Sequence, residues 1–261
     1  AGRAARAKPG VGGTMPGSNS DFHYLDILLF GVFPYLAVFV FLLVTIQRYR
    51  QQSFSYSSLS SQFLENDKHF WSMVPFHYGI LVVLLGHVVA FLFPRAILAW
   101  NGDPVRLIIL ELTAMIAGLL TLVGLVNLIM RRLRTPKLRV VTTKADIAVY
   151  ALLLFQVVTG LTVAYHQTWG SSWFASTLSP YLWSIVKLNP DVTYVTPLPL
   201  FVKLHVVSAF ALILVFPFTR LVHILVIPNM YLWRKTQVVR WNYARREIRQ
   251  AGSSASSKGD E

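Results

Sequence analysis

Four histidines lie inside long apolar segments of this 261-residue chain, and their type and spacing can support chemistry. His77 and His87 stand in one segment, and His205 and His223 stand in another. An ionisable side chain within such a segment is costly, so a function is its default interpretation. One histidine of this kind would be satisfied by a hydrogen bond to a neighbouring helix. Four on two segments, with few acids to pair with, favour metal binding by imidazole.

The spacing of these histidines predicts two levels of ligands. If residues 199–228 form one helix, His205 and His223 lie five turns apart on one face, about 27 Å along the axis. His77 and His87 are about 15 Å apart along their axis and roughly 80° apart in rotation. In antiparallel helices, His87 and His205 share one level, and His77 and His223 share the other. Two axial imidazoles at each level are the ligands of two six-coordinate haems.

Two other kinds of site fit this pattern less well. A zinc site needs four ligands at one level, whereas these histidines divide between two. A proton-relay transporter more often adds membrane acids, and only Asp26 and Glu111 approach the apolar segments. We expect Asp26 to be solvated at the mouth of its helix. We expect Glu111 to hydrogen-bond a neighbour or reach the interface, with proton acceptance from a substrate as the alternative.

Small and basic residues stand next to the histidines. Gly86 precedes His87, and Gly79 follows His77 by two residues. Glycine lets a large flat group approach a helix closely, but it also serves helix packing in membranes, and both interpretations stay open. Arg220 comes one turn before His223 and is expected either to pair with a haem propionate or to extend to the interface.

The composition predicts that membrane helices position these histidines. Hydrophobic residues make up 54% of the chain and charged residues 13%, which is half the charged share of a soluble domain, and the mean hydropathy is +0.52. The net charge of +13 is shared by nucleic-acid binders, but the hydropathy is not, so we expect a lipid bilayer and no nucleic acid as partner. Five apolar segments are long enough to cross the hydrocarbon, at about 24–46, 73–98, 105–130, 146–166 and 199–228. The sequence therefore predicts an all-α membrane protein built as a five-transmembrane-helix bundle.

The flanking segments define three parts and an orientation. Residues 1–20 read as a flexible tail, 21–233 as the five-helix domain, and 234–261 as a basic C-terminal segment. On the predicted topology, 17 of the 24 basic residues fall on the side of the C-terminus, against 7 on the other side. The positive-inside rule then predicts an outside N-terminus and a cytoplasmic C-terminus. The chain has no cysteine, which excludes thiolate-held iron–sulfur clusters.

Two connections carry local signals. The aromatic-rich connection 167–198 is interpreted either as a broken amphipathic helix on the outer interface or as an ordinary packed loop. Residues 142–146, TTKAD, predict the start of a helix, because a hydroxyl N-cap is followed by an acid in the first turn. We assign this start no chemistry.

Several motifs together resemble one family. They are FHYGIL at 76–81, GH at 86–87, KLH at 203–205, FPFTRLVH at 216–223 and RRLRTPKLRVVTTKAD at 131–146. On these motifs the chain, over about residues 26–240, resembles the gamma (cytochrome b) subunit of respiratory membrane-bound nitrate reductase. The GH dipeptide alone is a weak signal, whereas FPFTRLVH with four histidines in place is specific.

The resemblance implies a diheme b-type cytochrome. The outer haem b would be held by the residues matching His87 and His205, and the inner haem b by those matching His77 and His223. The family oxidises menaquinol or ubiquinol near the outer haem and passes electrons to an iron–sulfur beta subunit. A molybdenum alpha subunit then reduces nitrate to nitrite. The resemblance also implies a multi-pass protein of the bacterial or archaeal cytoplasmic (inner) membrane, whose C-terminal segment helps to dock the cytoplasmic partners.

The chain departs from the family at the quinol site. The family has a lysine near the start of the third helix, where this chain has Arg106 after a one-residue gap. Arginine keeps the charge and can hydrogen-bond a quinone oxygen, but it does not readily give up a proton. We expect quinol to contact Arg106 and to dock beside Gly86 and His87.

Two other functions are weighed beside this one. The nearest is another quinol-linked cytochrome b, such as the anchor of a formate dehydrogenase, hydrogenase or sulfite-reducing complex. FPFTRLVH favours nitrate reductase over these anchors. A haem-free transporter or scaffold is the alternative of a different class, and the four histidines argue against it.

Overall fold

The computed structural model describes residues 24–51, 70–140 and 142–225, which belong to one unit, Ala1–Leu225. Throughout these residues the regular structure is helical, and they contain no strand. Five of the helices are long and apolar enough to cross a membrane; these are Tyr24–Gln51, Trp71–Leu92, Pro104–Arg134, Lys144–His166 and Leu200–Phe218. The predicted all-α, five-helix class is therefore confirmed. The expected tail 1–20 and basic segment 234–261 lie outside the described residues.

Three of the spans are nearly continuous helices. The first begins with a π-helical segment, η1 (Ile27–Val32), and continues as α2 (Phe33–Gln51). The third is α5 (Pro104–Arg134) and the fourth is α7 (Lys144–His166), and the short helix α6 (Pro136–Val140) lies between them.

Polar caps start α5 and α7. The Asp103 carboxylate accepts hydrogen bonds from the backbone N–H groups of Val105 and Arg106, at 2.9 and 3.1 Å. Thr143 and Asp146 form a reciprocal capping box at the start of α7, at 3.2 and 3.0 Å. This confirms the helix start predicted at 142–146, because a hydroxyl N-cap and an acid three residues on satisfy two otherwise unpaired N–H groups.

Prolines end two of the predicted helices early. The second span is α3 (Phe70–Leu92), and after Phe93 the chain turns into a separate helix, α4 (Pro94–Trp100). The prediction of one helix over 73–98 was therefore wrong at its end. Proline disfavours the α conformation in the residue before it, and Phe93 has left that region, with φ −126° and ψ 54°.

The fifth span also ends earlier than predicted. α10 (Leu200–Val215) passes into one turn of 3-10 helix, η6 (Phe216–Phe218), and after Thr219 a second 3-10 segment follows, η7 (Arg220–Ile224). The proline ring of Pro217 supplies no N–H and clashes with the carbonyl one turn back, so the α-helix stops. The backbone of Thr219 is extended, with ψ 177°, so the helical course of the chain ends there.

The break changes the predicted relation between two histidines. A helix over 199–228 was wrong, and so was the expectation that His205 and His223 share one helix face five turns apart. The Arg48 guanidinium of α2 donates to the carbonyls of Pro217 and Thr219, at 2.7 and 3.4 Å. Arg48 thus binds the carbonyl groups at the break between η6 and η7.

The connection 167–198 combines the two predicted forms. It contains α8 (Gly170–Trp173), the π-helical η4 (Phe174–Leu178), α9 (Ser179–Val186) and a 3-10 turn, η5 (Val192–Tyr194). It is thus a broken helix, as one interpretation expected, while its position on the outer interface stays a prediction. It is also packed, as the other expected, because Tyr181 and Ser179 are fully buried.

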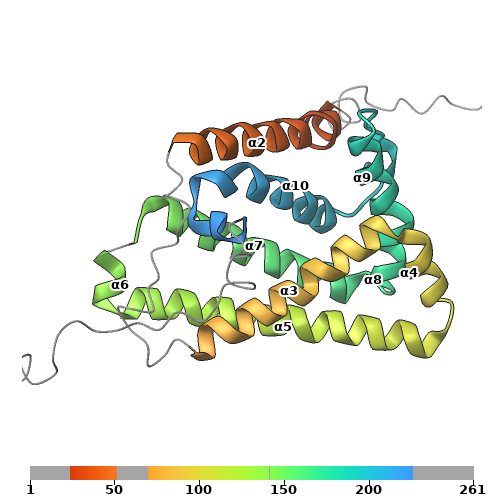
Figure 1. Ribbon diagram of the computed structural model, residues 1–261. Coiled ribbons are helices and arrows are strands. Elements are labelled where there is room, and N and C mark those ends of the chain that lie inside the picture. Colours follow the sequence, from red (N-terminus) through yellow and green to blue (C-terminus); the bar gives the residue numbers. More distant parts are fainter. Residues whose placement is uncertain (1–23, 52–69, 141, 226–261) are drawn as a thin grey trace, which may run out of the picture. The chain divides into compact units, whose positions relative to one another are not determined.

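Hydrogen bonds attach α9 to two of the membrane helices. The Ser179 hydroxyl donates to the Ala90 carbonyl of α3 at 3.0 Å, and the Trp183 indole donates to the next carbonyl of the same helix at 2.9 Å. The Tyr181 hydroxyl donates to the Phe30 carbonyl of the first span at 2.8 Å. Because α9 bridges α2 and α3, it closes one end of the helix arrangement (Figure 1).

The five long helices pack in an order that differs from their order in the chain. Each contacts the next in the series α2, α10, α7, α5 and α3 (Figure 1). Within the described residues, α3 shares no extended interface with α10 or with α2. The helices therefore form an arc in which α3, the helix of His77 and His87, does not pack directly on α10, the helix of His205.

Glycines bring α3 and α5 into close contact. A Cβ atom added to Gly79 would lie 2.6 Å from the Ala117 carbonyl oxygen, and one added to Gly124 would lie 2.7 Å from the Cα of Phe76. Small residues at membrane-helix interfaces allow backbones to approach in this way. Of the two interpretations of Gly79, helix packing is therefore the one that the structure supports.

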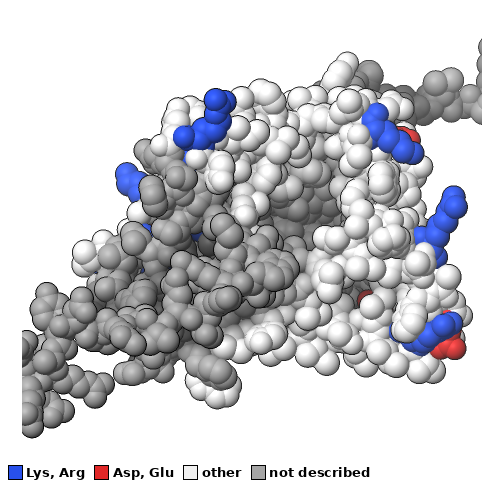
Figure 2. Space-filling view, viewed as in Figure 1, with Lys and Arg blue, Asp and Glu red and all other residues white. Residues whose placement is uncertain are grey.

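The surface of this part of the chain is that of a membrane protein. Its apolar side chains are widely exposed along all five spans, for example Phe39 at 63% and Leu112 at 57%. In Figure 2 the visible lysines and arginines of the described residues lie toward two opposite sides of this face. Long apolar spans between such charged ends suit the hydrocarbon of a bilayer.

Candidate functional site

The candidate site is the region where α3 and α10 face each other. α3 carries His77 and His87, and α10 carries His205. α3 packs against α5, and α10 packs against α7 and α2. The face drawn in Figure 2 is hollowed between the α2–α10 pair and α3. The predicted ligands thus stand on helices that flank this hollow.

His87 is held in one orientation by its own helix. Its Nδ1 lies 2.8 Å from the Val83 carbonyl oxygen one turn back. A carbonyl only accepts, so Nδ1 carries the proton and Nε2 carries the lone pair of the neutral ring. The Phe174 ring of η4 meets the imidazole edge to face at 5.3 Å between centroids. Next to it, a Cβ added to Gly86 would meet no atom within 4 Å, so this point of α3 is open.

His205 is the predicted partner of His87. Its ring lies on α7, where a Cβ added to Gly160 would sit 2.8 Å from the ring carbon Cε1. The ring nitrogens contact two polar side chains of α7, with Nδ1 3.1 Å from Thr159 Oγ1 and Nε2 3.3 Å from the Gln156 amide nitrogen.

His77 repeats the arrangement of His87 ten residues earlier. Its Nδ1 lies 2.8 Å from the Met73 carbonyl oxygen, which again assigns the proton to Nδ1 and the lone pair to Nε2. Its ring also meets the Phe76 ring edge to face at 5.3 Å. The predicted partner of His77 is His223, whose backbone lies in η7 but whose side chain lies outside the described part of the structure.

These histidines fit the axial positions of a haem. Iron ligation needs a neutral imidazole with one unprotonated nitrogen and a hydrogen bond on the other nitrogen. His77 and His87 both present Nε2 in this form. Haem takes only two protein ligands, so it does not need a larger cluster. Among residues 24–51, 70–140 and 142–225, no group of three or more His, Asp or Glu side chains gathers around one point.

Comparison with known proteins bears on this arrangement. A family model described as the nitrate reductase gamma subunit matches residues 26–242, which span all five helices. The chain belongs to the nitrate reductase gamma subunit family. It is 31% identical over 216 residues to the nitrate reductase gamma chain of Bacillus subtilis, covering 82% of this chain and 97% of that one. It is also 32% identical over 220 residues to the respiratory nitrate reductase 1 gamma chain of Escherichia coli, covering 83% of this chain and 98% of that one.

In this gamma-family chain, the acid at the start of the first span is buried. The Asp26 residue is only 6% exposed, and the Lys203 ammonium donates to both of its carboxylate oxygens at 2.9 Å. The expectation that Asp26 is solvated was therefore wrong. A lysine two residues before His205 neutralises the carboxylate, and the pair joins the first span to the start of α10.

The second membrane acid has a structural role in this gamma-family chain. One Glu111 carboxylate oxygen accepts from the backbone N–H and the hydroxyl of Ser171, at 2.8 and 2.7 Å. These contacts lie in the first turn of α8, where a carboxylate satisfies N–H groups that have no helical partner. The expectation that Glu111 hydrogen-bonds a neighbour is confirmed.

The two predicted arginines are both engaged with neighbours. The Arg106 guanidinium lies over the Trp100 ring of α4, 5.3 Å from its centroid. Its backbone N–H is held by the cap of α5, so the residue sits at the first turn of that helix. Arg220 forms an ion pair with Asp146 at 3.2 Å, while its predicted contact with a haem propionate stays a prediction.

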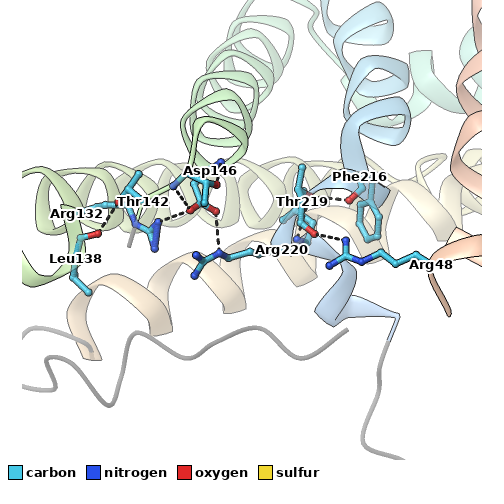
Figure 3. A network of polar contacts seen from close by, with 10 residues as sticks. Arg48, Arg132, Leu138, Thr142, Asp146, Phe216, Thr219 and Arg220 are labelled. Atoms are coloured by element: carbon cyan, nitrogen blue, oxygen red, sulfur yellow. Dashed lines mark hydrogen bonds and ion pairs between the residues drawn. The ribbon is translucent and has the colours of Figure 1, made fainter. Parts of the chain in front are cut away.

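Arg220 belongs to a polar network that sets the position of η7. Asp146 accepts from Arg132 of α5 at 3.1 Å through its other carboxylate oxygen (Figure 3). The Asp146 carboxylate is 7% exposed, and its pair with Arg132 is more shielded from water than its pair with Arg220, whose side chain is 33% exposed. Together with the contacts of Arg48, this network ties the segment of His223 to α2, α5 and α7 (Figure 3).

Sequence reasoning missed the residues of α7 that contact His205. Gln156 and Thr159 stand in an apolar span, and Gly160 follows them. A polar amide inside such a span is the signal that was available, because it needs a partner there. Which partner it meets depends on how α7 packs against α10, and the local sequence does not specify that.

Proposed function

We propose that this chain is a diheme b-type cytochrome subunit that oxidises quinol and feeds electrons to a nitrate reductase. His87 and His205 would hold the outer haem b, and His77 and His223 the inner one. The observation that carries the proposal is the tautomer of the α3 histidines, in which Nδ1 is bonded to a backbone carbonyl and Nε2 keeps its lone pair. In this tautomer Nε2 can bind iron without first losing a proton.

The chain's own groups would do three things for the haem. The helices α3 and α10 hold the axial imidazoles apart, because each packs on other helices instead of on its partner. The backbone carbonyls of Met73 and Val83 fix two of the rings. Bound haem iron would supply reversible one-electron transfer between its ferric and ferrous states. The apolar spans exclude water and so influence the reduction potential.

Quinol would dock beside the outer pair. The open point at Gly86, next to His87, leaves room for a flat ring. Arg106 would donate a hydrogen bond to a quinol oxygen, and its guanidinium would keep its own proton. The quinol protons would therefore leave through other groups or water at the outer side.

The proposed orientation puts the N-terminus outside and the C-terminus in the cytoplasm. It rests on the excess of basic residues on the C-terminal side, 17 against 7. The electrons of menaquinol or ubiquinol would then leave on the cytoplasmic side, where an iron–sulfur beta subunit and a molybdenum alpha subunit would receive them. The protein would lie in a bacterial or archaeal cytoplasmic membrane.

Optical spectra of variants test the ligand assignment. We expect two b-type haems per chain after dithionite reduction, one haem in each of the variants His77→Ala and His87→Ala, and two in the matched variant His166→Ala. His166 ends α7 and contacts the Phe201 ring, so it controls for the loss of any imidazole. A colourless, fully folded protein would exclude the function, and two haems in both variants would exclude these ligands.

The quinol contact has its own test. Arg106→Ala should slow haem reduction by a menaquinol or ubiquinol analogue, while dithionite still reduces both haems. Unchanged quinol kinetics would remove Arg106 from the site and leave the haem assignment standing.

A further inference from the structure

The strongest unexplained feature beside the proposed site is the contact of His205 with α7. The Thr159 hydroxyl donates to the Phe155 carbonyl of its own helix at 2.8 Å. Its proton is used there, so toward His205 the oxygen is an acceptor, and Nδ1 at 3.1 Å is the donor. Thr159 is 8% exposed, so this hydrogen bond is shielded from water. The contact therefore assigns the proton of His205 to Nδ1.

The second contact of the His205 ring is with Gln156, and iron binding would break this contact. The Gln156 amide donates to Nε2, and the Ser208 hydroxyl contacts the amide oxygen. A nitrogen that binds iron has no lone pair left for Gln156, so that contact cannot coexist with ligation through Nε2. The Thr159 contact involves the other nitrogen, so ligation through Nε2 would require the Gln156 amide to move and would leave Thr159 in place.

We propose that Thr159 is a positioning residue that fixes Nε2 of His205 as the iron-binding nitrogen and lowers the reduction potential of the outer haem. This inference rests on the proposed function. His77 and His87 donate from Nδ1 to carbonyls of their own helix, whereas His205 donates from Nδ1 to a side chain of another helix. The orientation of His205 therefore depends on how α7 and α10 pack together.

The effect on the potential follows from the chemistry of the hydrogen bond. An acceptor on Nδ1–H increases the electron density at Nε2 and makes the imidazole a stronger donor to iron. A stronger donor stabilises the ferric state and lowers the potential. Gly160 is needed for the same contact, because a Cβ there would collide with the ring carbon between the two nitrogens.

A redox titration of the haems in membranes tests the proposal. Thr159→Val keeps the shape of the side chain and removes the acceptor. We expect both haems to be retained, with the potential of one shifted upward and that of the other unchanged. Thr159→Ser should restore the original potential. Thr162→Val is the matched control, because its hydroxyl bonds the Val158 carbonyl in the same helix at 2.9 Å and is exposed.

The outcomes separate this proposal from the function on which it rests. The proposal would be wrong if Thr159→Val left both haem potentials unchanged. It would also be wrong if Thr159→Ser, which keeps the hydroxyl, shifted a potential as much as Thr159→Val does, because the hydroxyl would then not act on His205. If Thr159→Val lost one haem while Thr159→Ser kept both, the role in holding the ligand would be supported. A His205→Ala protein that kept both haems would instead reject the ligand assignment itself.

Discussion

Replacement of Gly124 by alanine should destabilise the protein and displace part of the site. The new Cβ would lie 2.7 Å from the Cα of Phe76 and still closer to its backbone nitrogen. Backbone atoms cannot rotate away, so α3 and α5 must separate. A gap of roughly 0.5–1 Å forfeits a quarter to a half of each dispersion contact along the interface. Overpacking of this kind costs about 1–3 kcal/mol, and alanine returns at most about 1 kcal/mol through helix propensity.

The expected net loss for Gly124→Ala is therefore about 2 kcal/mol, near the upper end because the contact is with backbone. Unfolding in a titration of mixed micelles with sodium dodecyl sulfate, followed by far-UV circular dichroism, measures it. Gly86→Ala is the matched control, since its Cβ would meet no atom within 4 Å, and its stability should be unchanged or slightly higher. Equal stability of the two variants would refute the close approach of α3 and α5 at Phe76.

Two further predictions concern groups outside the histidine site. Asp26→Leu should cost about 3 kcal/mol in the same assay, the lower end for a broken buried pair, because the Lys203 side chain remains 21% exposed. Adding Lys203→Met should recover most of the loss, and no recovery would contradict the pairing. Burial raises the pKa of the Tyr181 phenol. The contribution of the neutral phenol to folding stability is therefore intact below about pH 10, the pKa of an unfolded tyrosine, and is lost as the pH rises above that value. Tyr181→Phe should lower the free energy of unfolding by about 1 kcal/mol at neutral pH. Above about pH 10 the stability of this variant should fall less than that of the wild type. If the stabilities of the two proteins ran parallel across this pH range, the reasoning would be refuted.

The sequence does not predict which prolines interrupt a membrane helix. Pro34 in α2 and Pro75 in α3 lie inside continuous helices, whereas Pro94 and Pro217 coincide with breaks. Membrane helices tolerate proline when neighbours satisfy the freed carbonyl. At Pro217 the neighbour is Arg48, which bonds the carbonyls of the broken form instead. The broken form is therefore the one in which a side chain 169 residues away contacts the freed carbonyl of Pro217.

The sequence by itself determined the class, the family and the candidate ligands. Long apolar segments must form helices in a bilayer, since every backbone group has to be satisfied internally, and the motifs around the histidines are short and local. Only the tertiary structure decided that Asp26 is paired with Lys203, that Gly79 serves packing, and that His205 lies against α7. These facts depend on the order in which helices pack, and side chains far apart in the chain meet only when that order is set.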